Sequence, residues 1–280
     1  MRRLKIIRNH LSSKQTISQF KSDLIKIESH NEQIKIVRMT NLSNLNSLSV
    51  ELLDNLYIAL TILNRDEKTK VIILTGNEKV FCAGADVSYL SKISYSEIVN
   101  YDYLKNIERI SYEISKPLIA AVSGFCLGGG FELALACDII GCTKISKFGF
   151  PEIKLGLFPG AGGTQRLSRV AGYYKACEVI FSGDIMDSET VKKMNAVNFI
   201  YDDYETLMKN TLLLAEKIAG YSAIAVKTSK KAIKASMETS LREGIEAERN
   251  IFYGLFNTQD KEIGTKAFLN KIKKPVFVDK

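Results

Sequence analysis

Two glutamates lie in the part of the chain where glycine is concentrated, and both could transfer protons. Ten of the 18 glycines fall within residues 124–163. Glu132 follows the glycine triplet at 128–130, and Glu152 follows a proline in the apolar segment FGFPE. Apolar surroundings raise the pKa of a carboxyl group toward the range in which it can act as an acid or a base near neutral pH. The pair therefore indicates acid–base chemistry, provided that the fold brings the two carboxyl groups together.

Each glutamate also has an ordinary structural interpretation. Glu132 would lie in the first turn of a helix that starts at the glycine triplet, where a carboxylate can simply cap that helix. Glu152 could be a loop carboxylate. The same strand–turn–helix pattern leaves backbone N–H groups free at the helix N-terminus, and such groups can stabilise a developing oxyanion. The glycine backbone is therefore itself a candidate for binding, because glycine allows close approach of a ligand.

Other catalytic chemistries find little support in the sequence. The two histidines, His10 and His30, both lie in polar segments, which argues against a Ser-His-Asp or Cys-His site. The five cysteines form no C-x-x-C pair, so we expect no metal site. Their odd number favours a reducing compartment. Neither phosphate-binding glycine motif, GxxxxGK[ST] or GxGxxG, occurs, which argues against nucleotide hydrolysis and dinucleotide chemistry.

The positive charge of the chain is concentrated at its N-terminus. The formal net charge is +8, and residues 1–22 carry six Lys and Arg and no acid, which leaves +2 for the rest. A nucleic-acid surface is therefore not expected on the body of the protein. The leader is basic and contains serine, with Leu4, Ile7 and Leu11 at helical spacing, and this predicts a mitochondrial transit peptide. No membrane span is expected, because the longest uncharged apolar stretch, residues 118–131, is shorter than the ~20 residues required.

The apolar pattern predicts an α/β fold. Strands are expected at 24–27, 34–37, 71–74 and 118–122, the first two joined by a polar turn around His30. Helices are expected where leucines recur between residues 52 and 63, and again over a polar region from about 94 to 115. From about residue 204 the pattern becomes helical. We therefore divide the chain into a leader (1–22), an α/β core (23–203) and a helical C-terminal region (204–280).

Long motifs then identify a family. The segments FCAGAD (81–86), GFCLGGGFEL (124–133), FPEIKLGLFPGAGGTQRL (150–167) and FSGD (181–184) resemble the enoyl-CoA hydratase/isomerase (crotonase) superfamily, most closely its mitochondrial hydratases. The resemblance covers about residues 24–275. It implies a spiral of ββα units followed by a helical trimerisation region, and a homotrimer or a dimer of trimers. It implies no cofactor, since coenzyme A is part of the substrate.

The resemblance also implies roles for single residues. The backbone N–H groups of Ala85 and Gly129 would bind the thioester oxygen, and Glu132 and Glu152 would be the catalytic carboxylates of a hydratase. The residues implied in substrate binding are Ala83, Asp86, Val87, Gly160, Phe268 and Lys271. Two positions depart from the family pattern, since Ser88 replaces a lysine that contributes to coenzyme A binding and Ile263 replaces a glutamate of a late motif.

The implied activity is the addition of water to an enoyl-CoA thioester, giving a 3-hydroxyacyl-CoA in the mitochondrial matrix. We assign Glu132 to water activation and Glu152 to protonation of the α-carbon, although the two roles could be exchanged. One alternative is a methylglutaconyl-CoA hydratase, and another is a Δ3,Δ2-enoyl-CoA isomerase working with Glu152 alone. RNA binding is the least favoured, because the helix expected at 49–64 lacks the lysines that RNA-binding relatives carry there.

Overall fold

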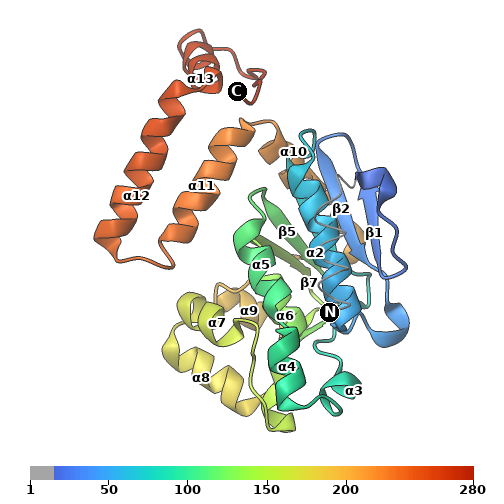
Figure 1. Ribbon diagram of the computed structural model, residues 1–280. Coiled ribbons are helices and arrows are strands. Elements are labelled where there is room, and N and C mark those ends of the chain that lie inside the picture. Colours follow the sequence, from blue (N-terminus) through green and yellow to red (C-terminus); the bar gives the residue numbers. More distant parts are fainter. Residues whose placement is uncertain (1–15) are drawn as a thin grey trace.

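The structure, a computed structural model, describes residues 16–280 (Figure 1). The chain forms two β sheets surrounded by helices, and its last helices make an arm that extends away from the sheets (Figure 1). The expected helical spacing at Leu4, Ile7 and Leu11 lies outside the described residues. The part of the leader that is described contains the short 3-10 helix η1 (Ile17–Gln19). Among residues 16–280, no helix is long and apolar enough to cross a membrane.

The first two strands form the predicted hairpin. Strands β1 (Ile25–Ser29) and β2 (Ile34–Met39) pair antiparallel, with Ile25 opposite Met39. The side chain of Asn31 closes the turn, because its Oδ1 accepts the backbone N–H groups of Gln33 and Ile34, both at 2.9 Å. This confirms the polar turn expected around His30.

The larger sheet has six strands in the order β1-β2-β3-β5-β7-β10. From β2 onward each strand runs parallel to its neighbours. Every residue of β3 and β5 is buried, as expected for parallel strands whose sequences are continuously apolar and covered on both faces. The strands that follow β2 in this sheet are β3 (Val71–Thr75), β5 (Leu118–Val122), β7 (Ile139–Thr143) and β10 (Phe199–Tyr201).

In the smaller sheet, three of the four strands each follow directly after a strand of the larger sheet. It consists of β4 (Val80–Cys82), β6 (Phe125–Leu127), β8 (Lys147–Gly149) and β9 (Met186–Asp187). Helical segments follow each of the pairs β3–β4, β5–β6 and β7–β8. These include α3 (Val87–Leu90), α6 (Gly129–Leu135), η3 (Pro151–Leu155), α7 (Gly163–Ala171) and α8 (Tyr173–Ser182), with α9 (Ser188–Lys193) after β9. The predicted spiral of ββα units is therefore confirmed.

Helix α2 (Val50–Arg65) carries the leucine stripe that the sequence predicts. It follows the 3-10 helix η2 (Leu42–Asn44), and the hydroxyl of Ser49 caps it by accepting the N–H of Leu52 at 3.1 Å. The leucines of the stripe are fully buried: Leu52, Leu53, Leu56, Leu60 and Leu63. The stripe therefore anchors α2 to the core.

The helical region expected at 94–115 is divided into two helices. Helix α4 (Tyr95–Tyr101) ends at Asp102, whose φ of +47° is a left-handed cap, and α5 (Lys105–Glu113) begins three residues later. The N–H of Asp102 donates to the carbonyl of Ile98 at 3.0 Å, as helix C-caps do. The polar sequence does not indicate this break, because aspartate is compatible both with a continuing helix and with a helix end.

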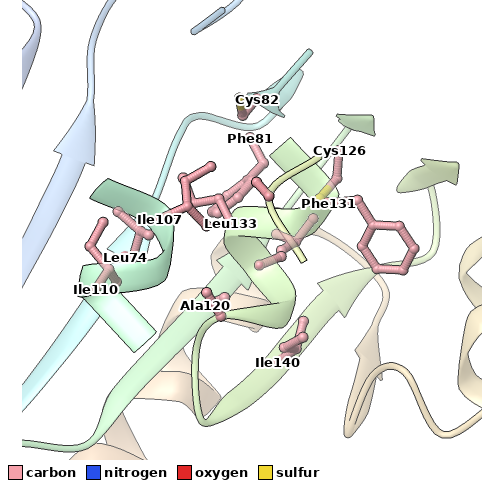
Figure 2. Close-up of a cluster of buried hydrophobic side chains, with 14 of the residues drawn as sticks. Leu74, Phe81, Cys82, Ile107, Ile110, Ala120, Cys126, Phe131, Leu133 and Ile140 are labelled. Carbon is pink, nitrogen blue, oxygen red and sulfur yellow. The ribbon is translucent and has the colours of Figure 1, made fainter. Parts of the chain in front are cut away.

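The core lies mainly between the larger sheet and helices α2, α5 and α6. Figure 2 shows Leu74, Ala120 and Ile140, which are partners across β3, β5 and β7, beneath Ile107 of α5 and Leu133 of α6. Helix α10 (Tyr204–Ala219) covers the other face of the same sheet, where it buries Leu207, Ala215 and Ala219. The first helix of the C-terminal region thus packs on the sheet.

The remaining helices form the arm: α11 (Ala223–Ala235), α12 (Leu241–Gly254), η4 (Leu255–Asn257) and α13 (Gln259–Leu269). Neither α11 nor α12 contains a buried residue, and Phe252 and Phe256 are each more than half exposed. Buried Asp260 holds the chain end, because it accepts the N–H of Val278 at 2.7 Å and the hydroxyl of Ser222 at 2.5 Å. The arm is therefore held by its own contacts and by bonds to the core, such as the ion pair of Lys230 with Asp138 at 2.6 Å, while several of its apolar side chains are exposed.

Candidate active site

The glycine triplet forms the junction between strand β6 and helix α6. Gly128 adopts φ 51° and ψ −128°, a conformation that favours glycine, and its N–H donates to the carbonyl of Gly149 on β8 at 2.8 Å. Gly129 is the first residue of α6, so its N–H has no acceptor within the helix. The strand–turn–helix pattern predicted from the sequence is confirmed.

The loop that follows β4 brings a second backbone N–H to the same place. Gly84 has φ +106°, and its carbonyl accepts the N–H of Leu48 at 2.8 Å. A Cβ atom built on Gly129 would lie 3.7 Å from the nitrogen of Ala85 and 3.0 Å from Cδ1 of Leu48. In the described residues, no backbone hydrogen bond outside regular helices and strands has the N–H of Ala85 or Gly129 as its donor. The two N–H groups therefore lie close together and are available to a ligand oxygen.

Glu132 is fixed in place by backbone groups. Its Oε1 accepts the N–H of Ala161 and the N–H of Gly163, both at 2.7 Å. The residue is only 1% exposed. Burial raises the pKa of this carboxyl group, while the two N–H donors and the charge of Arg166 act in the opposite direction. The side chain is thus a buried carboxylate with strong donors on one oxygen.

Glu152 reaches the same site from η3, with a different environment. A Cβ atom on Gly128 would lie 2.6 Å from Oε1 of Glu152, so only a glycine leaves room for this carboxyl group. Its Oε2 is buried, and no hydrogen-bond partner for it exists among residues 16–280. Burial, together with the negative charge of Glu132, raises the pKa of Glu152 to about 7. The fold thus brings the two glutamates together and gives them different tendencies to hold a proton.

Comparison with known proteins agrees with this geometry. A sequence model of the enoyl-CoA hydratase/isomerase family matches residues 29–280. The chain belongs to this family. A probable mitochondrial enoyl-CoA hydratase of Dictyostelium discoideum is 40% identical over 239 residues, which cover 85% of this chain and 86% of that protein. A mitochondrial enoyl-CoA hydratase of Pongo abelii is 38% identical, covering 87% of this chain and 83% of the relative.

Solved structures are similar over nearly the whole chain. The crystal structure of an enoyl-CoA hydratase from Bacillus anthracis has a TM-score of 0.87 and 33% identity, and it covers 92% of this chain and 100% of that one. An enoyl-CoA hydratase from Mycobacterium tuberculosis has a TM-score of 0.82 at 29% identity, covering 92% of this chain and 100% of that one. The fold is therefore that of the enoyl-CoA hydratase/isomerase family, C-terminal arm included.

Four other predicted residues lie in or beside the two loops that carry Ala85 and Ala161 in this family member. Gly160 immediately precedes the loop that holds Glu132, and a Cβ atom on it would lie 3.2 Å from Cδ1 of Leu104. The carboxylate of Asp86 caps α3, accepting the N–H of Tyr89 at 3.2 Å. The last two are near the predicted oxyanion loop: Ala83, whose N–H donates to the carbonyl of Leu45 at 3.0 Å, and Val87, which is 51% exposed.

Two predicted residues are not brought to the site by their own chain. Phe268 lies on α13 and is 84% exposed, and Lys271 follows that helix. Figure 1 shows α13 near the beginning of α11, where Asp260 bonds to Ser222, and well away from α6. The structure of the single chain therefore does not place these two side chains at the candidate active site of this family member.

Reasoning from the sequence missed the groups that position the glutamates. The N–H donors of Ala161 and Gly163 have no side-chain signature, although the run GAGG before a helix was a usable signal. The space that Gly128 leaves for Glu152 was also missed. Within residues 16–280, no group of three or more histidine, cysteine or acidic side chains is arranged to hold a metal ion.

Proposed function

We propose that this protein is an enoyl-CoA hydratase, which adds water across the α,β double bond of an enoyl-CoA thioester to give a 3-hydroxyacyl-CoA. The observation that carries the proposal is the pairing of buried Glu132 with partly buried Glu152, both with a raised pKa, beside the N–H groups of Ala85 and Gly129. The reaction needs one base, one acid and a site for negative charge. This arrangement offers all three, and coenzyme A enters as part of the substrate.

In this mechanism Glu132 is the base and Glu152 is the acid. The carboxylate of Glu132 takes a proton from water as the water oxygen bonds to the β-carbon. The carboxyl group of Glu152, whose pKa is about 7, gives its proton to the α-carbon. The proton on Glu132 then returns to Glu152 through solvent, so both groups are ready for the next turnover.

The thioester oxygen carries enolate charge between these two bond-forming events. The N–H groups of Ala85 and Gly129 would donate to it, and a preorganised donor of this kind contributes about 3–4 kcal/mol. Gly129 also belongs to the first turn of α6, whose dipole favours negative charge at that end. The backbone would therefore stabilise the charge, and the two glutamates would move the protons.

The anchoring of Glu132 favours a hydratase over an isomerase. An isomerase would need only Glu152 to carry a proton from one carbon to another, whereas here a second carboxylate is held by two backbone donors.

The test is a kinetic panel of short, long, branched and carboxylated 2-enoyl-CoA substrates, with a 3-enoyl-CoA beside them. Rapid loss of the ultraviolet absorbance of a conjugated thioester supports the proposal, and the preferred substrate would separate a methylglutaconyl-CoA hydratase from a fatty-acyl one. Conversion of the 3-enoyl-CoA alone would favour the isomerase.

The raised pKa of Glu152 predicts the pH dependence of the reaction. Hydration needs Glu152 protonated, so kcat/KM should fall about tenfold per pH unit once the pH rises above about 7. On the acidic side, kcat/KM should fall as Glu132 becomes protonated. Initial rates between pH 5 and 9, in buffers of constant ionic strength, would show a bell-shaped profile. A rate that stays constant from pH 7 to 9 would exclude Glu152 as the acid.

We also propose that the arm joins subunits into a homotrimer or a dimer of trimers. Its exposed apolar side chains include Leu241, Phe252, Phe256 and Phe268, which a monomer would leave in water. Removing residues 258–280 should therefore yield smaller, aggregation-prone species with a higher KM, because Phe268 and Lys271 are lost as well. Light scattering and substrate kinetics would check this. A full-length chain that is a stable monomer at micromolar concentration, with normal KM, would contradict both claims.

The basic leader supports a mitochondrial matrix location, and the two relatives from Dictyostelium discoideum and Pongo abelii are named mitochondrial. We expect residues 1–30 fused to a fluorescent reporter to direct it into mitochondria, because the segment combines arginines with an absence of acids up to Ser22. Replacing the arginines at positions 2, 3 and 8 by glutamine should abolish import. A reporter that remains cytosolic would refute the location, and bacterial relatives such as that of Rhizobium meliloti would then be the better guide.

A further inference from the structure

Arg166 lies behind the loop that holds Glu132. It is the fourth residue of α7, and its Nη1 donates to the carbonyl of Ala161 at 2.9 Å. A Cβ atom on Gly162 would lie only 2.1 Å from the same Nη1, so the guanidinium is packed directly against that glycine. Gly162 has φ +106°, a conformation that favours glycine in any case. The contact is therefore built into the local backbone.

The guanidinium of Arg166 and the carboxylate of Glu132 both bond to the loop formed by residues 161–163. Ala161 gives its carbonyl to Arg166 and its N–H to Glu132, and Gly163 gives its N–H to Glu132 as well. If the loop rotated, both donors to Oε1 would be lost together. Arg166 thus restrains the groups that orient the proposed base.

Of the two carboxylates whose charge acts on Arg166, Glu132 has the larger effect and Glu108 the smaller. Arg166 makes no ion pair with any residue of the described chain, and burial lowers its pKa. Glu132 is affected by this positive charge, which favours its ionised form, and it in turn faces Glu152 from η3. The other titratable groups that interact with the guanidinium come from three directions: Glu108 and Tyr112 of α5, Cys137 after α6, and Lys234 of α11.

From these contacts we infer that Arg166 is a positioning residue for the reaction: it fixes the 161–163 loop on Glu132 and places a positive charge near the carboxylate that removes a proton from water. The inference rests on the proposed hydratase function. It concerns the orientation and the charge of Glu132, and it does not require Arg166 to touch the substrate. The expected signature is therefore in kcat and in the acidic limb of the pH profile, with KM little changed.

The structure suggests how a guanidinium group could be supplied to a variant that lacks the Arg166 side chain. Arg166 lines a cavity of about 1360 Å³ between the core and the arm, together with Gly160 and Ile233, so a small cation from solvent can reach the position that its side chain leaves empty. Arg169 lies one turn further along α7 on its exposed face, where its Nη1 donates to the carbonyl and to Oε1 of Gln165. Arg169→Ala is thus a matched control that removes a guanidinium from the same helix without affecting the loop.

The experiment compares Arg166→Ala, Arg166→Lys and Arg169→Ala in the full chain. We expect Arg166→Ala to lower kcat about tenfold or more and to move the acidic limb of kcat/KM to higher pH, because a positive charge near Glu132 is lost. In Arg166→Lys the acidic limb should lie close to that of the unaltered chain. Guanidinium chloride at about 50 mM should raise the rate of Arg166→Ala and of no other variant, with sodium chloride at the same concentration as the control. Circular dichroism and light scattering would verify folding and assembly.

Three results would overturn the inference. One is an acidic limb in Arg166→Ala that coincides with that of the unaltered chain. The second is an equal loss in Arg166→Lys and Arg166→Ala with no response to guanidinium, which would show a packing role alone. The third is an equal loss in Arg169→Ala. If Arg166→Ala does not fold, Arg166→Gln, which keeps most of the side-chain volume and loses the charge, takes its place in the comparison. Failure of the unaltered chain to hydrate any enoyl-CoA would instead reject the proposed function.

Discussion

Replacing Glu132 by glutamine is expected to lower kcat for hydration about 10²-fold or more, and replacing Glu152 by glutamine should have an effect of the same order. Glutamine keeps the size of the side chain, and its oxygen can still accept the N–H groups of Ala161 and Gly163. It can neither take a proton from water nor give one to the α-carbon. KM should change much less, because neither carboxyl group is assigned to binding coenzyme A.

The two substitutions should differ in their pH profiles. Glu152→Gln removes the group whose pKa is about 7, so its residual activity should no longer decrease above that pH. Glu132→Gln should lose the acidic limb and keep an alkaline decrease that begins at lower pH, because the charge of Glu132 no longer raises the pKa of Glu152. Glu67→Gln is a suitable control, because Glu67 is exposed in the turn after α2. Near-full hydration by Glu132→Gln would refute the two-carboxylate mechanism and would favour an isomerase.

Gly128→Ala is expected to reduce kcat about 10²-fold as well, without removing any chemical group. A methyl group at this position would lie 2.6 Å from Oε1 of Glu152, so the carboxyl group would have to move, and a displacement of about 1 Å can cost 10²-fold in rate. Alanine also resists the φ of 51° and ψ of −128° found here. The measurement is kcat, together with the thermal unfolding temperature.

Gly172→Ala provides the matched control for this substitution. Gly172 also has a positive φ, 83° with ψ 160°, and a Cβ atom on it would meet nothing within 4 Å. It should therefore lose stability through backbone strain and retain most of its activity. If the two variants lost activity equally, strain would explain the result, and the contact between Gly128 and Glu152 would have no special importance.

Much of the fold could be predicted because its signals are local. The apolar runs at 71–75 and 118–122 are strands that are buried completely, and an unbroken apolar sequence is typical of such strands. The leucines of α2 recur with the helical period and are all buried. The end of α4 at Asp102 could not be predicted, since it depends on one residue adopting a left-handed conformation that its sequence merely permits.

The candidate site was predictable in its side chains and less so in its supports. Glu132 and Glu152 stood out because glycines and apolar residues surround them, and the structure places them together. The donors that hold Glu132 are backbone N–H groups 29 and 31 residues away along the chain. Such donors cannot be recognised from residue types, because every residue except proline has a backbone N–H. Phe268 and Lys271 could not be located from one chain, because the arm carries them away from α6.

The unpartnered Oε2 of Glu152 has a consequence for the stability of the protein. In the unfolded chain this carboxyl group would titrate near its ordinary pKa of 4.5, whereas in the folded chain the pKa is about 7. Between these values the folded state holds a proton that the unfolded state has released. Its contribution to the free energy of unfolding is therefore complete below pH 4.5 and is lost as the pH rises through 7. At alkaline pH the native fold contains a buried negative charge without a partner, so the acid that the proposed reaction requires makes the resting enzyme easier to unfold. Selection for activity and selection for durability then act in opposite directions on a single side chain.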